Sequence, residues 1–179
     1  MSTTTAPAQP IAFTATPETV GDRTIIRVPE DASAELPSRG QVAAHAVIDG
    51  HQHSIVVEPD GRRGHWLSVP ADLREGLGDT VSVALTPTKD WPEPQLPDDL
   101  REALDAASHL AEVWAGLTPM ARWEWVRWIG ATRNPETRAK RVRVTISKLE
   151  DGKRRPCCFD LSSCTDPELS RSGKLIPTS

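Results

Sequence analysis

The residues best suited to bind a ligand lie in a tryptophan- and arginine-rich stretch, residues 118–149. Three of the chain's six tryptophans are in this stretch, and several arginines follow them closely. Guanidinium groups bind oxyanions through paired hydrogen bonds, and indole rings stack on sugars and cations. The stretch therefore predicts a site for an anionic or sugar-bearing ligand. Its candidate residues are Trp125, Trp128, Arg133, Arg138 and Arg141. The alternative is that the indoles form a core and the arginines a solvated face.

Histidines form a second group with potential chemistry. Alternation along an extended segment puts His51 and His53 on one face, as a metal site requires, and His45 and His65 lie in neighbouring β-like runs. However, no carboxylate pattern completes a ligand set. The pair also flanks the Asp49-Gly50 turn, where exposed polar residues are ordinary. We therefore predict no metal site here.

The three cysteines form a third group, at Cys157, Cys158 and Cys164, after the basic run 153–155. Three thiolates and a histidine can hold Zn²⁺, and neighbouring cations activate thiols. Adjacent cysteines are nevertheless poor partners for a tetrahedral ion, and no C-x-x-C spacing is present. We expect a structural or exposed thiol segment, with metal binding and redox activity left open.

Signatures of catalysis are missing from the rest of the chain. It contains no serine-nucleophile motif, glycine-rich phosphate loop or dinucleotide fingerprint. This favours a binding protein over an enzyme and predicts no cofactor.

Two helices are expected to position the tryptophan and arginine side chains. Thr118-Pro119 and Asn134-Pro135 each combine an N-cap residue with a proline at the first helical position. In the first helix, the spacing of Trp123 with residues 126 and 129 predicts that Trp123 is core, with Trp125 and Trp128 toward the edges. Glu124 is expected on the polar side.

A third helix is predicted upstream, over Asp98–Leu117, so that three helices form one small module. In the last helix Arg138 and Arg141 are one turn apart. They are expected to point together toward the preceding domain or a cleft beside it.

The N-terminal half predicts a small β-barrel. Six short β-like runs are separated by turn signals: Ile11–Thr16, Thr24–Val28, Gln41–Ile48, Ser54–Glu58, His65–Val69 and Thr80–Leu85. A weak internal repeat links Val28-Pro29 with Val69-Pro70. Each pair is followed by a leucine, a glycine and a strand. Two such units, with Val42 and Val81 on equivalent strands, can interlock about a pseudo-two-fold axis into a closed barrel.

The expected domain organisation has five parts, and the fold class is α+β. They are a disordered N-terminus (1–10), a barrel domain (11–86), a proline-rich linker (87–97), a helical domain (98–150) and a basic, cysteine-bearing C-terminal tail (151–179).

Charge is distributed unevenly. The whole chain has a formal net charge of −4. Residues 1–96 carry 7 Lys/Arg against 13 Asp/Glu, whereas residues 122–155 carry 11 against 4. An anionic partner would therefore meet the helical half, and the net negative charge argues against general nucleic-acid binding. No signal-peptide pattern or long apolar run is present, so no membrane span is predicted and the chain is expected to be cytoplasmic.

Four segments together resemble a known family. They are V-P…G-D-x-V, P-D-D-L-R-E-A-L, W-E-W-V-R-W-I-G-A and E-T-R-A-K-R-V, within residues 11–165. In this order they are similar to the bacteriocin-protection family, called YdeI/OmpD-associated, with an N-terminal domain of unknown function. The resemblance implies a double-split β-barrel, like that of AbrB-type transcription factors, followed by the helical module. Family members often have a lysine after the tryptophan helix, where this chain has Thr132-Arg133.

The resemblance implies protection against bacteriocins, antimicrobials or oxidative stress, and it supplies no catalytic residue. We expect a non-enzymatic binding protein whose partner is an anionic small molecule or a protein. One alternative is an AbrB-like DNA-binding regulator, although the acidic barrel half lacks the basic stripe that phosphate contacts require. A metal-dependent enzyme is a second alternative. The oligomeric state stays open.

Overall fold

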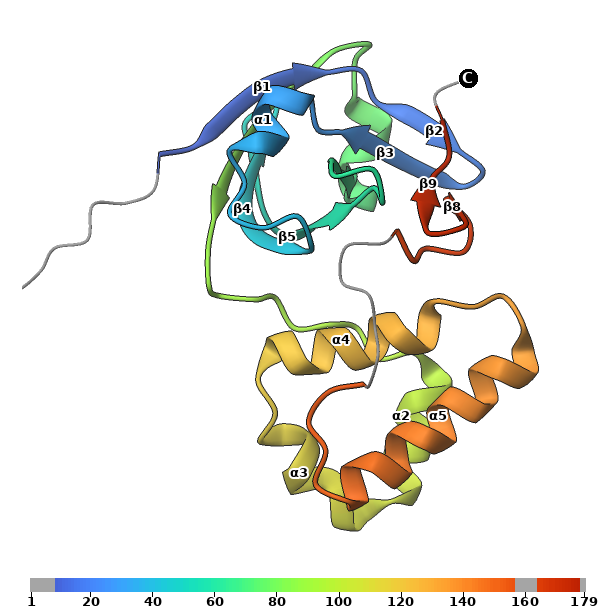
Figure 1. Ribbon diagram of the computed structural model, residues 1–179. Coiled ribbons are helices and arrows are strands. Elements are labelled where there is room, and N and C mark those ends of the chain that lie inside the picture. The colour runs from blue at the N-terminus through green and yellow to red at the C-terminus, as the bar shows by residue number, and fades with distance from the viewer. Residues whose placement is uncertain (1–8, 157–163, 178–179) are drawn as a thin grey trace, which may run out of the picture. The chain divides into compact units, whose positions relative to one another are not determined.

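The chain divides into two compact units, residues 1–91 and 92–179, called here the sheet unit and the helical unit. The computed structural model describes residues 9–156 and 164–177 (Figure 1). A curled antiparallel sheet in the first unit and helices in the second confirm the predicted α+β class. Among the described residues, no helix has both the length and the apolar character needed to cross a bilayer.

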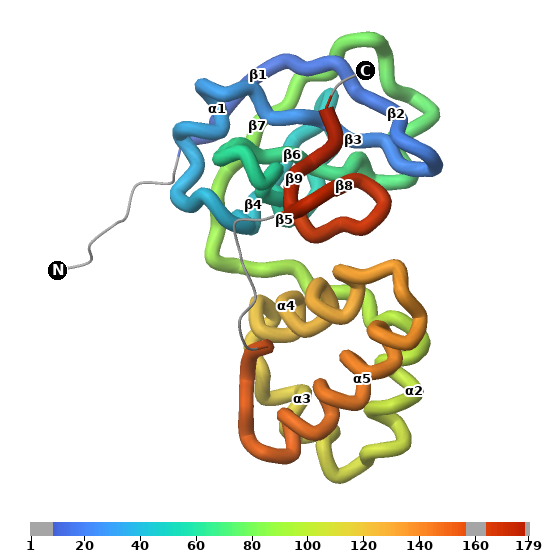
Figure 2. Tube along the Cα trace, turned by 45° about the vertical axis from the view of Figure 1, so that its right-hand side comes forward, coloured from blue at the N-terminus to red at the C-terminus, as the bar shows by residue number. Residues whose placement is uncertain are grey.

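The sheet unit is a curled, seven-stranded antiparallel sheet (Figures 1 and 2). Its order is β1-β7-β4-β5-β6-β3-β2. The strands are β1 Ile11–Ala15, β2 Glu18–Val20, β3 Arg23–Arg27, β4 Val42–Ile48, β5 His51–Pro59, β6 His65–Ser68 and β7 Val81–Pro87. The sequence missed β2, because three residues are too few to show alternation. The sheet is a half-barrel rather than the closed barrel expected, since β1 and β2 end it and pair with β7 and β3 rather than with each other.

The two predicted repeat units interlock within this one sheet. One unit is β3, the helix α1 (Glu30–Ala34) and β4; the other is β6, the 3₁₀ helix η1 (Ala71–Gly76) and β7. Pro29 and Pro70 are the N-cap residues of the two helical turns. β3 pairs with β6, and β4 pairs with β7. The flanking bonds are reciprocal, because Val28 N–H donates to the His65 carbonyl (3.0 Å) and Val69 N–H to the Thr24 carbonyl (2.9 Å). The predicted equivalence of the two units is confirmed.

The core of the sheet unit lies inside the curl, where side chains from both repeat units meet. Leucines and β-branched residues dominate it, as a pleated surface buried on one side requires. Fully or nearly fully buried members are Ile26, Ala44, Ala46, Ile48, Val57, Leu67, Val81, Val83 and Leu85.

The helical unit has one break that the sequence did not show. The segment expected as one helix, Asp98–Leu117, forms α2 (Asp98–Ala106), the 3₁₀ helix η2 (Ser108–Leu110) and α3 (Ala111–Ala115). At Ala107 the backbone leaves the helical region, with φ −109° and ψ 60°. The break lets Leu110 and Leu117 join the core while Ala111 stays exposed. The prediction of a single helix over Asp98–Leu117 is therefore wrong.

The remaining helices begin where the sequence predicts. In α4 (Pro119–Gly130) the Thr118 hydroxyl accepts from the Ala121 N–H at 3.1 Å. In α5 (Pro135–Glu150) the Asn134 side chain accepts from two backbone N–H groups of the first turn, at 2.9 and 3.2 Å. Helix α5 packs against both α2 and α4 (Figure 2).

The chain ends in a short hairpin, β8 (Ser170–Arg171) and β9 (Lys174–Leu175). Cys164 is buried, and its N–H donates to the Gly173 carbonyl at 2.8 Å. Cys157 and Cys158 lie outside the described residues, so the expectation for the cysteine segment applies here only to Cys164.

Candidate functional site

Trp125 is the centre of the helical core. It is fully buried, its ring lies edge-on to that of Trp128 with centroids 6.0 Å apart, and its indole N–H donates to the Arg154 carbonyl at 2.9 Å. Trp123 is only half-buried. The predicted assignment of Trp123 to the core and Trp125 to the edge is therefore wrong. As a fully buried group, Trp125 has no surface on which a ligand can stack.

Glu124 is buried as well, although it was expected on the polar side of the helix. The residue is 2% exposed, and its carboxylate accepts two hydrogen bonds of 2.6 Å from the Arg155 guanidinium. The hydrogen bonds that Arg155 donates to this carboxylate raise the pKa of Arg155. A buried carboxylate needs such a paired donor, because the desolvation cost is otherwise uncompensated. Together with the bond from Trp125 to Arg154, this ion pair holds residues 154–155 against α4.

Trp128 and Arg141 form a fixed aromatic–cation pair. The Arg141 guanidinium carbon lies 5.3 Å from the centroid of the Trp128 ring. One Arg141 nitrogen also donates to the Trp128 carbonyl at 2.6 Å, near the C-terminal end of α4. Both residues are half-buried, so part of the pair remains open to solvent.

Arg138 is held by a different helix. Its guanidinium donates to both carboxylate oxygens of Asp99 in α2, at 2.7 and 3.2 Å. The hydrogen bond from Arg138 lowers the pKa of Asp99. The side chains are 33% and 40% exposed, which leaves the pair accessible at the surface. Arg138 and Arg141, expected to point together, are thus anchored on α2 and α4 respectively.

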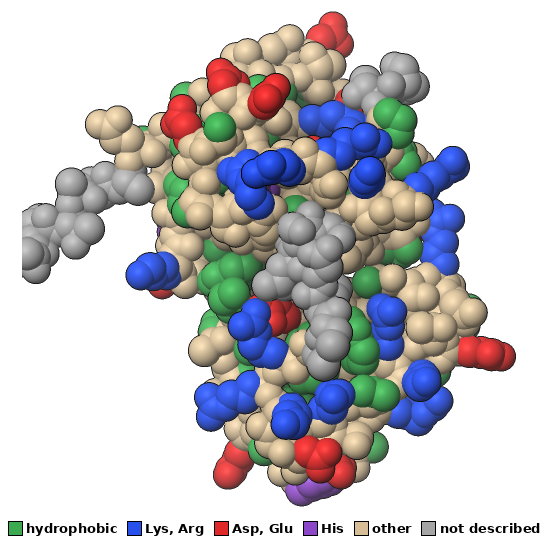
Figure 3. Space-filling view, in the orientation of Figure 1, with side chains coloured by type: hydrophobic (Ala, Val, Ile, Leu, Met, Phe, Trp, Pro, Cys, Tyr) green, Lys and Arg blue, Asp and Glu red, His purple; other side chains and the backbone are tan. Residues whose placement is uncertain are grey.

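Arg133 is the most accessible of the candidate residues. It lies in the connection between α4 and α5 and is exposed. Within the described parts of the chain, no hydrogen bond or ion pair engages its guanidinium. Lys140 and Arg143, on α5, are exposed too. Figure 3 shows several such basic side chains on the face of the helical unit seen there. Four of the five predicted residues therefore reach the surface, and Trp125 does not.

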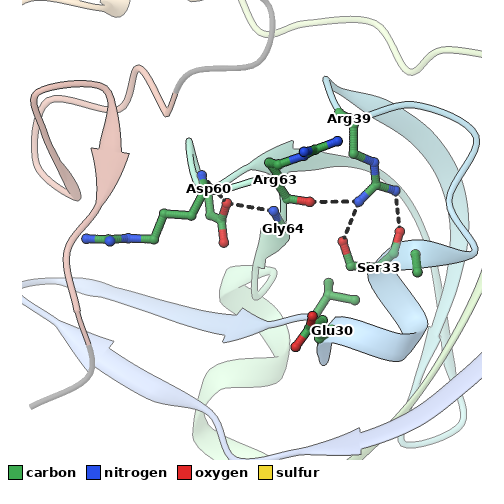
Figure 4. Close-up of a pocket in the computed structure, with 9 residues that line it drawn as sticks. Glu30, Ser33, Arg39, Asp60, Arg63 and Gly64 are labelled. Carbon is green, nitrogen blue, oxygen red and sulfur yellow. Dashed lines mark hydrogen bonds between the residues drawn. The ribbon is translucent and has the colours of Figure 1, made fainter.

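The sheet unit contains a polar pocket that sequence reasoning missed (Figure 4). Its volume is about 680 Å³, and its lining includes Ser33, Arg39 and the β5–β6 turn. Beside it, the Ser33 hydroxyl lies 2.7 Å from Nδ1 of the buried His65. His65 Nε2 lies 2.9 Å from the Gly40 carbonyl, an acceptor only, so Nε2 donates and Nδ1 accepts the serine proton. Burial holds the pKa of His65 below its ordinary value, so that the ring is neutral.

Two family models match the chain, one in each unit. Residues 93–152 match OmdA, described as "Bacteriocin-protection, YdeI or OmpD-Associated". Residues 13–85 match a domain of unknown function, DUF1905. The helical unit therefore carries a domain of the YdeI/OmpD-associated family. This confirms the resemblance read from the sequence. None of the curated proteins matches the chain.

The candidate residues of the helical unit all fall within the segment that matches the YdeI/OmpD-associated family. The polar pocket falls within the DUF1905 segment. The clustering of basic residues in the sequence was the signal that predicted the candidate site of the helical unit. Nothing in the spacing of Ser33, Arg39 and His65 signals that the fold brings them together.

The histidines of the sheet unit do not converge. His53 Nε2 lies 3.8 Å from an Asp72 carboxylate oxygen, and His45 and His51 are exposed. Among the described residues, no three His, Cys, Asp or Glu side chains are grouped as metal ligands. His65, considered with this group from the sequence, belongs instead to the buried serine network.

Proposed function

We propose that this chain is a non-enzymatic binding protein that recognises an anionic small molecule or an acidic protein partner through its helical unit. Its role would be the one the family description names, protection against bacteriocins, extended to antimicrobial or oxidative stress. The cytoplasm is the expected place of action. The binding surface consists of Trp128, Arg133, Arg138 and Arg141, the candidate residues that reach the surface.

The observation that carries this proposal is the Arg141 guanidinium held over the Trp128 ring. Its bond to the Trp128 carbonyl fixes it in place. A fixed guanidinium loses less conformational entropy when an anion binds than a free one does. Because guanidinium is weakly hydrated, the remaining donors are also less costly to desolvate.

The surrounding charges favour the same partner. Residues 122–155 carry 11 Lys/Arg against 4 Asp/Glu, and Glu124 is already neutralised by Arg155. Arg133 adds a guanidinium with no internal partner among the described residues. Arg138 can contribute only by sharing its donors between Asp99 and the ligand. We therefore assign the larger part of the binding to Arg133 and Arg141.

The test is calorimetric titration of the full-length protein with pyrophosphate and with a short oligoglutamate peptide. Arg133→Gln combined with Arg141→Gln should weaken binding by about tenfold or more, since each charge-assisted hydrogen bond contributes about 1.5–3 kcal/mol. Arg101→Gln is the matched control. Arg101 is an arginine of α2 paired with the exposed Asp98, and its loss should leave the affinity within about twofold. Unchanged affinity in the double variant would refute the assignment.

Arg138→Ala separates a binding role from a structural one. Because its ion pair is partly exposed, the variant should lose no more than about 1 kcal/mol of unfolding free energy. It should still bind more weakly than the wild type. If Arg138→Ala instead loses as much unfolding free energy as a core tryptophan variant, Arg138 has a structural role and is not part of the binding site.

Duplex DNA belongs in the same titrations because an AbrB-like regulator is the alternative. Tight binding that weakens steeply between about 50 and 200 mM salt would favour that alternative. We expect no such binding, given 13 acidic against 7 basic residues in residues 1–96.

A further inference from the structure

The pocket of the sheet unit has a rigid rim at the β5–β6 turn. One Asp60 carboxylate oxygen accepts from the Arg62 N–H at 2.6 Å and from the Gly64 N–H at 2.8 Å. The Asp60 N–H donates in turn to the Gly64 carbonyl at 3.0 Å. A Cβ on Gly64 would lie 2.5 Å from the other carboxylate oxygen, so any larger residue here would displace the Asp60 side chain. The turn therefore fixes the backbone from which Arg62 and Arg63 project.

Arg63 occupies a backbone conformation that costs energy. Its φ is +74°, in the left-handed region that a long side chain seldom adopts. Its carbonyl is held by Arg39, which donates to it at 2.7 Å. Figure 4 shows the Arg63 side chain extending toward Arg39 at one end of the pocket. Strain of this kind persists only where the surroundings enforce it, and it is common at ligand sites.

Arg39 is the clamp between the rim and the helix α1. Besides the Arg63 carbonyl, it donates to the Ser33 hydroxyl at 3.1 Å, to the Ser33 carbonyl, and to the Leu36 carbonyl at 3.3 Å. Its terminal nitrogens are thus used inside the protein. The Ser33 hydroxyl is fixed from the other side by His65. Arg39 therefore positions the rim, and the guanidinium groups that could bind an anion are those of Arg62 and Arg63.

The two rim arginines are available for a ligand. Arg62 and Arg63 are both exposed, and within residues 9–156 and 164–177 no hydrogen bond or ion pair engages either guanidinium. With Arg39 they place three positive charges around one pocket, against the carboxylates of Glu30 and Asp60. A guanidinium group with no internal partner can bind an oxyanion through paired, charge-assisted hydrogen bonds, and the excess of positive charge at this pocket favours such a ligand.

We propose that this pocket binds a small sugar phosphate, with Arg62 and Arg63 contacting the phosphate. The volume of about 680 Å³ falls in the range of small-molecule sites and is far larger than an inorganic ion requires. Glu30 is exposed in the same pocket and can accept hydrogen bonds from sugar hydroxyls. Val28 and Ala34 supply apolar wall against which a sugar ring can pack. This site is separate from the helical surface proposed above.

The test is a titration of the ¹⁵N-labelled full-length protein, followed by NMR, with ribose 5-phosphate, inorganic phosphate and ribose as probes. Ribose 5-phosphate should shift the Gly64 amide and bind at least about fivefold more tightly than phosphate, because the sugar adds contacts of its own. Ribose alone should leave the spectrum unchanged. Equal binding of phosphate and ribose 5-phosphate would overturn the sugar-phosphate assignment, as would the absence of binding by either.

Charge-matched variants locate the site. Arg63→Gln and Arg62→Gln should each weaken ribose 5-phosphate binding by about tenfold, whereas Lys89→Gln should change it by less than about twofold. Lys89 is an exposed cation of the same unit and serves as the control. The double variant Arg133→Gln, Arg141→Gln should bind ribose 5-phosphate as tightly as the wild type does. The pocket proposal and the helical-surface proposal can therefore fail independently of each other. Wild-type affinity in both rim variants would refute the proposal.

Discussion

Replacing Trp125 by alanine should destabilise the helical unit more than replacing any other tryptophan of α4. Trp125 is fully buried and packs edge-on against Trp128 in a core that includes Leu110, Leu117 and Leu149. Truncating a buried tryptophan to alanine costs about 3–5 kcal/mol, since the surrounding core closes the cavity only in part. That approaches the lower end of the total stability of a small domain, about 5 kcal/mol. The unit should be largely unfolded in mild urea.

The matched comparison is Trp123→Ala, two residues away in the same helix. Trp123 is half-buried, so its truncation should cost about 1 kcal/mol. Urea denaturation followed by far-UV circular dichroism measures both, because the helices supply most of that signal. The spacing of Trp123 with residues 126 and 129 predicts the opposite order. Equal losses in the two variants, or a larger loss for Trp123→Ala, would refute the burial of Trp125 described above.

A subtler substitution separates the cavity from the hydrogen bond. Trp125→Phe keeps an aromatic ring but removes the indole N–H that donates to the Arg154 carbonyl. The expected loss is smaller than for alanine, about 1–2 kcal/mol, from one hydrogen bond and a reduced ring volume. Faster hydrogen exchange around residues 153–155 should accompany it, because that bond helps to hold the segment against α4.

Three further outcomes follow from buried or crowded groups. Since burial lowers the pKa of His65, the unfolded chain binds a proton that the folded one does not. The sheet unit should therefore be fully stable above about pH 6.5 and weaken as the pH falls, by at most about 1.4 kcal/mol per pH unit, in urea titrations at several pH values. Gly64→Ala should cost about 1–3 kcal/mol by displacing the Asp60 carboxylate, measured the same way. Arg155→Ala should lower the free energy of unfolding by about 2 kcal/mol, because it leaves the buried Glu124 carboxylate unpaired. The loss is smaller than for a fully buried ion pair, since the Arg155 side chain is 56% exposed. Adding Glu124→Gln should recover part of the lost stability.

The sequence predicted those features that depend on local chemistry. Thr118 and Asn134 cap their helices as expected, because a side-chain oxygen in that position satisfies N–H groups that no helix can satisfy internally. The interlocked units of the sheet were also predictable from Val28-Pro29 and Val69-Pro70. Proline fixes its own φ and disfavours helix in the residue before it, so each pair marks where a strand ends and a helical turn begins.

What the sequence could not predict depends on distant partners. Apolar residues occur on nearly every side of α4, so the spacing alone does not say which side is buried. Trp125 is buried because it packs in one cluster with Leu117 and Leu149, which come from other parts of the unit. The burial of Glu124 likewise requires Arg155, which lies beyond the end of the next helix. The break at Ala107 has no proline or glycine to announce it.

The arginines of this chain divide according to whether their donors are already used. Arg39 donates to carbonyls and a hydroxyl, and Arg155 donates to a buried carboxylate. Replacing either arginine should therefore lower stability and affect binding only indirectly. Arg63 and Arg133 are exposed, and no contact among the described residues engages their guanidinium groups, so their removal should act on binding at nearly constant stability. Arg138 lies between these classes, because its ion pair is partly open to solvent. Measuring affinity and unfolding free energy together in each variant therefore separates the residues that build the two surfaces from those that contact a ligand.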